Sequence, residues 1–174
     1  MAAFHIDSHF LNEIKDLIRQ DDKKNLERKL RPIHYADLGE IIEEISINDA
    51  IYLIKLLGSE KTADALADVD PDIREGILDK LSAKEIANEV LELDTDDAVD
   101  IILELNEERQ EKVMSQINND VHLNDIRDLL RYEENTAGGL MAKELVKVQE
   151  DLSVLKCLNE MRAQAKNISR VHSI

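Results

Sequence analysis

The sequence is poor in the residues that give a protein a bulky aromatic core or a disulfide framework. Its 174 residues include no tryptophan, two phenylalanines, three tyrosines, one cysteine and two prolines. A core without aromatic bulk has to be filled by Leu, Ile, Val and Ala, which favours short packed helices. The single cysteine, Cys157, excludes an intramolecular disulfide and a cysteine metal cluster, and is consistent with a reducing cytoplasm.

Long hydrophobic runs are also missing. The longest, such as Ile51-Tyr52-Leu53-Ile54, are interrupted by charge at Lys55, far short of the roughly 20 apolar residues that cross a bilayer. The amino terminus has no basic region followed by a long apolar stretch, and so does not read as a secretory signal. From these absences we expect the chain to lie on the cytoplasmic side of the membrane.

Positive charge is in short supply. Against 38 acidic side chains there are 22 basic ones, giving a net charge of -16, and 34 of the acidic residues fall within residues 1–140. Such a surface repels phosphate backbones, so nucleic acid and anionic lipid are poor partners, whereas cations and basic proteins are attracted. Acidity that serves only to keep the chain soluble is the alternative interpretation.

What the sequence does contain is a repeat of helix-capping residues. Candidate caps recur every 11 to 13 residues at Ser46, Ser59, Asp70, Ser82, Thr95 and Asn106. Asp70 precedes a proline at the first helical position, and Ser82 with Glu85 has the spacing of a capping box. Each cap is followed by about three turns with an apolar face, so the repeat predicts a series of short helices. Two further amphipathic stripes lie upstream, over residues 11–18 and 26–33.

Helices this short are marginal in isolation and must bury their faces against one another. Consecutive short helices with a shared apolar seam predict a superhelix or solenoid. Beyond them the pattern changes: residues 145–148 read as a strand, residues 153–164 as a helix, and residues 168–174 as a second strand.

One stretch is not explained by composition or capping. Residues 131–141 read Arg-Tyr-Glu-Glu-Asn-Thr-Ala-Gly-Gly-Leu-Met. This segment resembles the junction in MgtE-type magnesium transporters where a helical amino-terminal domain meets a CBS (cystathionine-β-synthase-type) module. The sequence departs from that family at Ala142-Lys143, where a Thr-Pro pair is common. The resemblance implies a helical domain over residues 1–130, a linker over 131–143 and the truncated start of a CBS domain over 144–174.

The expected fold class is therefore all-α, a right-handed superhelix or solenoid of short stacked helices, followed by an incomplete α+β CBS-domain start. Because a CBS fold needs further strands and a second helix, we expect this last part to leave strand edges unpaired. We do not expect it to bind a nucleotide.

The densest acidic cluster is Asp94, Asp96, Asp97 and Asp100. Asp96 and Asp100 are one helical turn apart and share a face that is distinct from the apolar face of the same helix. Negative charge at a helix start is stabilising, which accounts for Asp96 and Asp97 without any ligand. Asp100 lies past the first turn, and its like-charge pairing with Asp96 costs about 0.2–0.5 kcal/mol. A solvated acidic face and a site for a hard cation are both consistent with this pattern.

The resemblance adds specific roles. Acidic residues at the matching helix start bind regulatory Mg²⁺ in the MgtE family, which implies Asp96 and Asp100 as metal ligands. The second glycine of the signature, Gly139, implies a backbone carbonyl ligand, a suitable donor for a hard cation. Asp64 falls where the family also places an acidic ligand. The residues alone explain Gly138 and Gly139 as a turn that needs torsions disfavoured by a Cβ.

No Gly-rich phosphate loop, Ser/His/Asp order or nucleophile beside a base is present, so we do not expect an enzyme. The resemblance implies the cytosolic Mg²⁺-sensing domain of a magnesium transporter or channel, at the cytoplasmic face of the membrane. Its partners would be the CBS and transmembrane domains of the same chain, beyond residue 174, in a homodimer. Two alternatives remain: a helical-repeat adaptor for a protein partner, like flagellar motor switch proteins, and a stand-alone soluble magnesium sensor.

Overall fold

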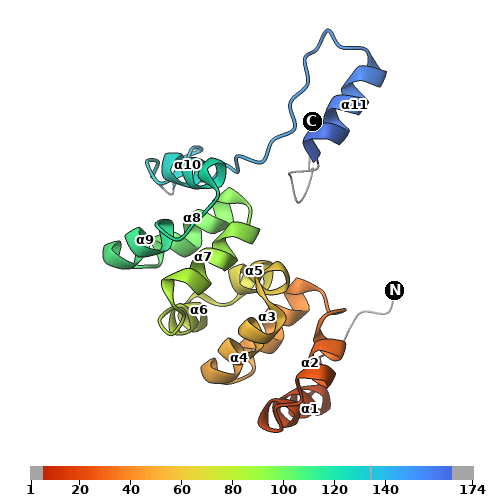
Figure 1. The fold of residues 1–174 in the computed structure, drawn as a ribbon, viewed down its shortest axis with the longest axis vertical. Helices are drawn as coiled ribbons and strands as arrows, with labels where there is room; N and C mark the ends of the chain where they lie inside the picture. The colour runs from red at the N-terminus through yellow and green to blue at the C-terminus, as the bar shows by residue number, and fades with distance from the viewer. Residues whose placement is uncertain (1–5, 134, 166–174) are drawn as a thin grey trace.

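The computed structural model describes residues 6–133 and 135–165, and within them it contains eleven α-helices and no β-strand. Figure 1 shows the helices following one another along a curved stack, with α1 and α2 at one end and α10 at the other. The bounds are α1 Ser8–Arg19, α2 Lys23–Leu30, α3 Tyr35–Glu43, α4 Ile47–Leu57, α5 Ser59–Asp68, α6 Pro71–Leu78, α7 Ala83–Glu92, α8 Thr95–Leu103, α9 Glu107–Met114, α10 Asp120–Leu129 and α11 Val154–Gln164.

The capping repeat starts most of the central helices where the sequence predicts. Ser46, Asp70 and Asn106 each accept a hydrogen bond from a backbone N–H of the first turn of α4, α6 and α9. Ser82 and Glu85 form both hydrogen bonds of a capping box at α7. These caps satisfy amide groups that have no partner inside the helix, which is why short helices can begin so sharply.

Two predicted caps are wrong by one residue. Ser59 and Thr95 are the first helical residues of α5 and α8, and the cap positions are Gly58 and Asp94, neither of which makes a side-chain cap hydrogen bond. Gly58 has φ of 80°, in the left-handed region that a side chain disfavours. At α8 the capping interaction comes from a distant residue, Glu144, described below.

The stack is held by contacts between helices two apart in the sequence. α3 packs on α5, α5 on α7, and α7 on α9, while α4 packs on α6 and α8 on α10. One continuous aliphatic core runs through these contacts from Ile14 in α1 to Leu129 in α10. The prediction of an all-helical stack of short helices is confirmed.

Two arginines tie successive units together. Arg74 in α6 donates to the carbonyls of Ala67 and Val69 at the end of α5, and its Nε lies 3.0 Å from each carboxylate oxygen of Glu104. Arg109 repeats the arrangement, donating to the carbonyls of Leu78 and Leu81. Each guanidinium thus satisfies carbonyls at a helix end that lack partners within the helix.

The carboxyl-terminal part differs from the prediction. Residues 145–148 are extended but form no strand, so the described residues contain no α+β start of a CBS domain. A strand needs a neighbouring strand for its hydrogen-bond ladder. Here the Lys147 N–H donates to Gln164 Oε1 at 2.9 Å, and Gln164 Nε2 donates to the Lys147 carbonyl at 2.8 Å. The predicted helix is present as α11, with no buried residue, standing apart from the stack (Figure 1).

The predicted strand over residues 168–174 lies outside the described residues. Among the residues that the structure does describe, none of the helices combines the length and the apolar character needed to span a bilayer.

Candidate cation site

Helix α8 carries the acidic cluster on the face turned away from the core. Ala98, Val99, Ile101 and Ile102 are buried, which fixes the orientation of this short helix. Asp100 is consequently exposed, and Asp96 is half-buried one turn before it. The shared face predicted for these two carboxylates follows from the same packing.

The cluster creates a strongly negative local field. The pKa of Asp97 is raised to about 6 by partial burial of its carboxyl group together with the negative charges of Asp96, Asp94, Asp100 and Asp64, with burial the largest cause, although part of the side chain is in contact with solvent. Asp64 is half-buried on α5, and it lies near enough to α8 for its negative charge to raise the pKa of Asp97. A raised pKa in an acid means that the ionised form is disfavoured, so an added cation relieves the repulsion.

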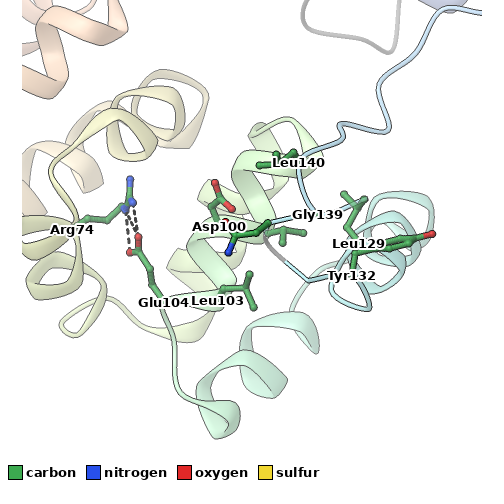
Figure 2. A pocket seen from close by; sticks show the side chains of 10 residues that line it. Arg74, Asp100, Leu103, Glu104, Leu129, Tyr132, Gly139 and Leu140 are labelled. Carbon is green, nitrogen blue, oxygen red and sulfur yellow. Dashed lines mark hydrogen bonds and ion pairs between the residues drawn. The ribbon is translucent and has the colours of Figure 1, made fainter. Parts of the chain in front are cut away.

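A cavity of about 390 Å³ joins two of the predicted ligands. Asp100 on α8 and Gly139 in the linker both line it, although they are 39 residues apart in the sequence. Figure 2 labels both residues, with Asp100 coming from α8 and Gly139 from the segment that follows α10. Its other lining residues are Arg74, Val99, Leu103, Glu104, Leu129, Tyr132, Asn135 and Leu140.

The glycine turn is shaped by contacts within the signature. The Thr136 hydroxyl donates to the Glu133 carbonyl at 2.7 Å and accepts from the Gly139 N–H at 3.2 Å. A Cβ at Gly138 would lie 2.6 Å from Cγ of Tyr132, closer than real Cβ atoms approach. The torsional explanation for these two glycines is wrong, because Gly58 has the sole positive φ among the glycines described. Gly138 is required by the ring of Tyr132.

The sequence did not indicate Arg74 and Glu104 as part of this cavity. The guanidinium of Arg74 is engaged by the Glu104 carboxylate, as the dashed lines of Figure 2 show. An unpaired arginine beside Asp100 would repel a cation, and the ion pair removes most of that repulsion. The signal available in the sequence was weak, because a single Arg and a single Glu 30 residues apart have no recognisable spacing.

A second unforeseen group lies at the start of α8. Glu144 Oε2 accepts from the Thr95 N–H at 3.2 Å and from the Thr95 hydroxyl at 2.9 Å. The same hydroxyl accepts from the Lys143 N–H at 2.8 Å, and Lys143 Nζ lies 2.5 Å from Asp128 on α10. These bonds attach the linker to α8 and α10, two of the helices that line the cavity.

The donor set fits a hard cation that is only partly enclosed by protein. In the described residues, nowhere do three His, Cys, Asp or Glu side chains converge closely enough to hold a metal ion. What they do offer is the Asp100 carboxylate and the backbone of Gly139 in one cavity, with Asp96 a turn away. Oxygen donors in small number suit Mg²⁺, which keeps several of its waters.

Comparisons with known proteins agree on one family. The family model described as the MgtE intracellular N domain matches residues 33–135. The magnesium transporter MgtE of Thermus thermophilus is 25% identical over 163 residues, which are 92% of this chain and 36% of the transporter. The chain therefore spans about a third of the length of that curated relative.

Solved structures agree on the fold. The crystal structure of the cytosolic domain of the Mg²⁺ channel MgtE in complex with ATP matches with a TM-score of 0.81 and 24% identity, over 93% of this chain and 66% of that one. The crystal structure of the soluble part of a magnesium transporter matches with a TM-score of 0.79 and 20% identity, over 93% and 64%. At these identities the structural matches establish the shared fold.

Proposed function

The chain belongs to the MgtE intracellular N domain family, and we propose that it is the cytosolic Mg²⁺-sensing domain of an MgtE-type magnesium transporter or channel. In this proposal Asp96 and Asp100 of α8, with the Gly139 carbonyl, contribute protein ligands to a regulatory Mg²⁺ site, and Asp64 contributes from α5. The domain senses the ion and does not conduct it.

The observation that carries the proposal is the cavity shared by Asp100 and Gly139. These residues come from different parts of the chain, and each offers an oxygen of the kind that Mg²⁺ prefers. The acidic field around α8 adds a reason for a cation to bind there, because it already disfavours the ionised form of Asp97. Charge concentrated in this way is costly unless something compensates it.

The carboxylates act by repelling one another when no cation is present. Two unit charges about 4 Å apart repel by about 1 kcal/mol in water and about 4 kcal/mol at a protein surface. Bound Mg²⁺ would supply the positive charge that converts this repulsion into attraction. Asp100 is exposed and Asp96 half-buried, one turn apart on α8, which supports a contact with carboxylates of another domain in this proposal.

That other domain is, in this proposal, the CBS part of a longer chain. At high cytosolic Mg²⁺ the two acidic surfaces are held together and the compact state closes the pore. At low Mg²⁺ the surfaces separate and the pore opens. A two-state arrangement of this kind needs only a difference in cation affinity between the two states.

The test is Mg²⁺-dependent transport by the longer transporter carrying this domain, reconstituted in vesicles. Asp100→Ala is expected to keep transport active at Mg²⁺ concentrations that shut off the unmodified protein, and Asp96→Ala is expected to weaken the shut-off in the same direction. Glu40→Ala is the matched control, since it removes an exposed carboxylate from α3, near the other end of the stack (Figure 1). Normal shut-off in the Asp100→Ala protein contradicts the assignment.

A further inference from the structure

The contacts of Thr95, Lys143 and Glu144, which we call the latch, set where the linker runs. Thr95 is fully buried at the start of α8. Its hydroxyl donates to the Glu144 carboxylate and accepts from the Lys143 N–H. One side chain therefore bonds both the last residue of the linker and the residue that follows it. Lys143 then reaches Asp128 near the end of α10. The latch thus connects α8 and α10, two of the helices that line the Asp100 cavity.

Ordinary helix capping does not account for this arrangement. The N-cap residue of α8 is Asp94, a residue type that usually caps through its own side chain, yet it makes no side-chain cap hydrogen bond. A carboxylate 49 residues along the chain, that of Glu144, bonds the Thr95 N–H instead. The start of α8 and residues 143–144 are therefore joined directly by hydrogen bonds.

The latch also fixes the carboxyl-terminal end of the segment that contains the glycine turn. The turn leaves α10, where the Leu130 N–H bonds to Ile126 O at 2.9 Å, and it reaches the latch at Lys143. Between these points Thr136 holds the turn internally and Met141 packs against the core. With both ends fixed, Gly139 is kept in the wall of the cavity that Asp100 lines.

We propose that Thr95 is a positioning residue for the cation site, acting through Lys143 and Glu144 to hold the Gly138–Gly139 turn against the Asp100 cavity. The inference rests on the proposed function and deepens it. Thr95 itself contributes no ligand to the proposed site. Its hydroxyl determines whether the carbonyl of Gly139 is presented beside Asp100 or moves freely with the linker.

The first test is amide hydrogen exchange of the chain in the absence of divalent cations. Thr95→Val keeps the shape of the buried side chain and removes the hydroxyl, and Glu144→Ala removes the carboxylate. Both are expected to speed exchange within residues 136–146 about tenfold, because each breaks bonds that hold the linker. Thr95→Ser keeps the hydroxyl and is expected to exchange like the unmodified chain.

Thr62→Val is the matched control, since Thr62 is equally buried but lies on α5. It is expected to leave exchange in residues 136–146 unchanged. The latch is overturned if Thr95→Val and Glu144→Ala leave these amides protected. It is also overturned if exchange in Thr95→Val rises equally in α5 and α7, because Thr95 would then support the stack in general.

The second test separates the latch from the proposed function by measuring Mg²⁺-dependent shut-off in the longer transporter. Thr95→Val is expected to raise the Mg²⁺ concentration for half shut-off about tenfold, while Thr95→Ser leaves it unchanged. If Asp100→Ala abolishes shut-off but Thr95→Val has no effect, the positioning role is wrong and the sensor stands. If Asp100→Ala shuts off normally, the sensor itself is wrong, whatever the exchange data show for the linker.

Discussion

Glu89 Oε2 lies 2.9 Å from Thr62 Oγ1, joining α7 to α5 inside the stack. Both residues are buried, with Glu89 4% exposed, and the Thr62 hydroxyl is also 3.1 Å from the Gly58 carbonyl. One hydroxyl has a single proton and cannot donate to both. When Glu89 is protonated it donates to Thr62, and Thr62 donates to Gly58, so each group is satisfied.

This geometry predicts a stability that falls as pH rises through neutrality. The pKa of Glu89 is raised to about 7, because burial and the charge of Glu92 raise it more than the Thr62 hydrogen bond lowers it. The folded state then holds a proton that the unfolded state has released, so Glu89 costs stability between about pH 4.5 and pH 7, to a total of about 3 kcal/mol. Lys55 and Glu85 line a small cavity together with Glu89, and these two residues form an ion pair with each other.

Glu89→Gln measures this contribution directly. The amide can donate to Thr62 at any pH, so at pH 8 the variant is expected to be more stable than the unmodified chain by about 2–3 kcal/mol. Near pH 4.5 the two proteins are expected to unfold at nearly the same urea concentration. A constant difference across this range would show that Glu89 is not protonated on folding.

Arg74→Ala is expected to destabilise the stack by about 2–4 kcal/mol, because it leaves Glu104 and the carbonyls of Ala67 and Val69 without their donor in a partly buried place. Urea unfolding monitored by circular dichroism measures the loss. Arg19→Ala removes an exposed ion pair with Asp16 and serves as control, with an expected change within about 0.5 kcal/mol. Equal effects of the two variants would contradict the structural role of Arg74.

Gly58→Ala is expected to cost about 1–3 kcal/mol although a Cβ at this position would meet nothing within 4 Å. The cost is torsional, because Gly58 adopts φ of 80° between α4 and α5. Thermal unfolding measures it, with Glu60→Ala on the exposed surface of α5 as control. An unchanged unfolding temperature would mean that the backbone relaxes at this junction.

Gly138→Ala tests the opposite case, where the cost is steric. The new methyl group would collide with the Tyr132 ring, and we expect about 1–3 kcal/mol of local destabilisation. Amide exchange of Gly139 and Leu140 reports it. In a chain that already carries Tyr132→Ala, adding Gly138→Ala is expected to cost much less amide protection than it does in the unmodified chain, because the ring is no longer there to collide with the methyl group. An equal loss of protection with and without the Tyr132 ring would show that Tyr132 is not what excludes a side chain at Gly138.

Local patterns predicted most of the helical architecture. Ser46, Asp70, Ser82 and Asn106 cap helices because capping depends on a few neighbouring residues, and the aliphatic faces dictate stacking. The strand predicted at residues 145–148 is not formed, because a strand depends on a partner that local sequence does not supply. The ligand roles of Asp64, Asp96, Asp100 and Gly139 remain predictions.

The sequence by itself determined that this chain is acidic, helical and built from short capped units, since charge, periodicity and caps act over a few residues. Tertiary structure decided which distant groups meet. It brought Gly139 and Asp100 to the lining of one cavity, and it supplied Glu144, in place of Asp94, as the side chain that bonds the first N–H of α8. It also packed the Tyr132 ring against Gly138. The separations of Asp100 from Gly139 and of Thr95 from Glu144 are set by how the helices stack, and no local pattern encodes them.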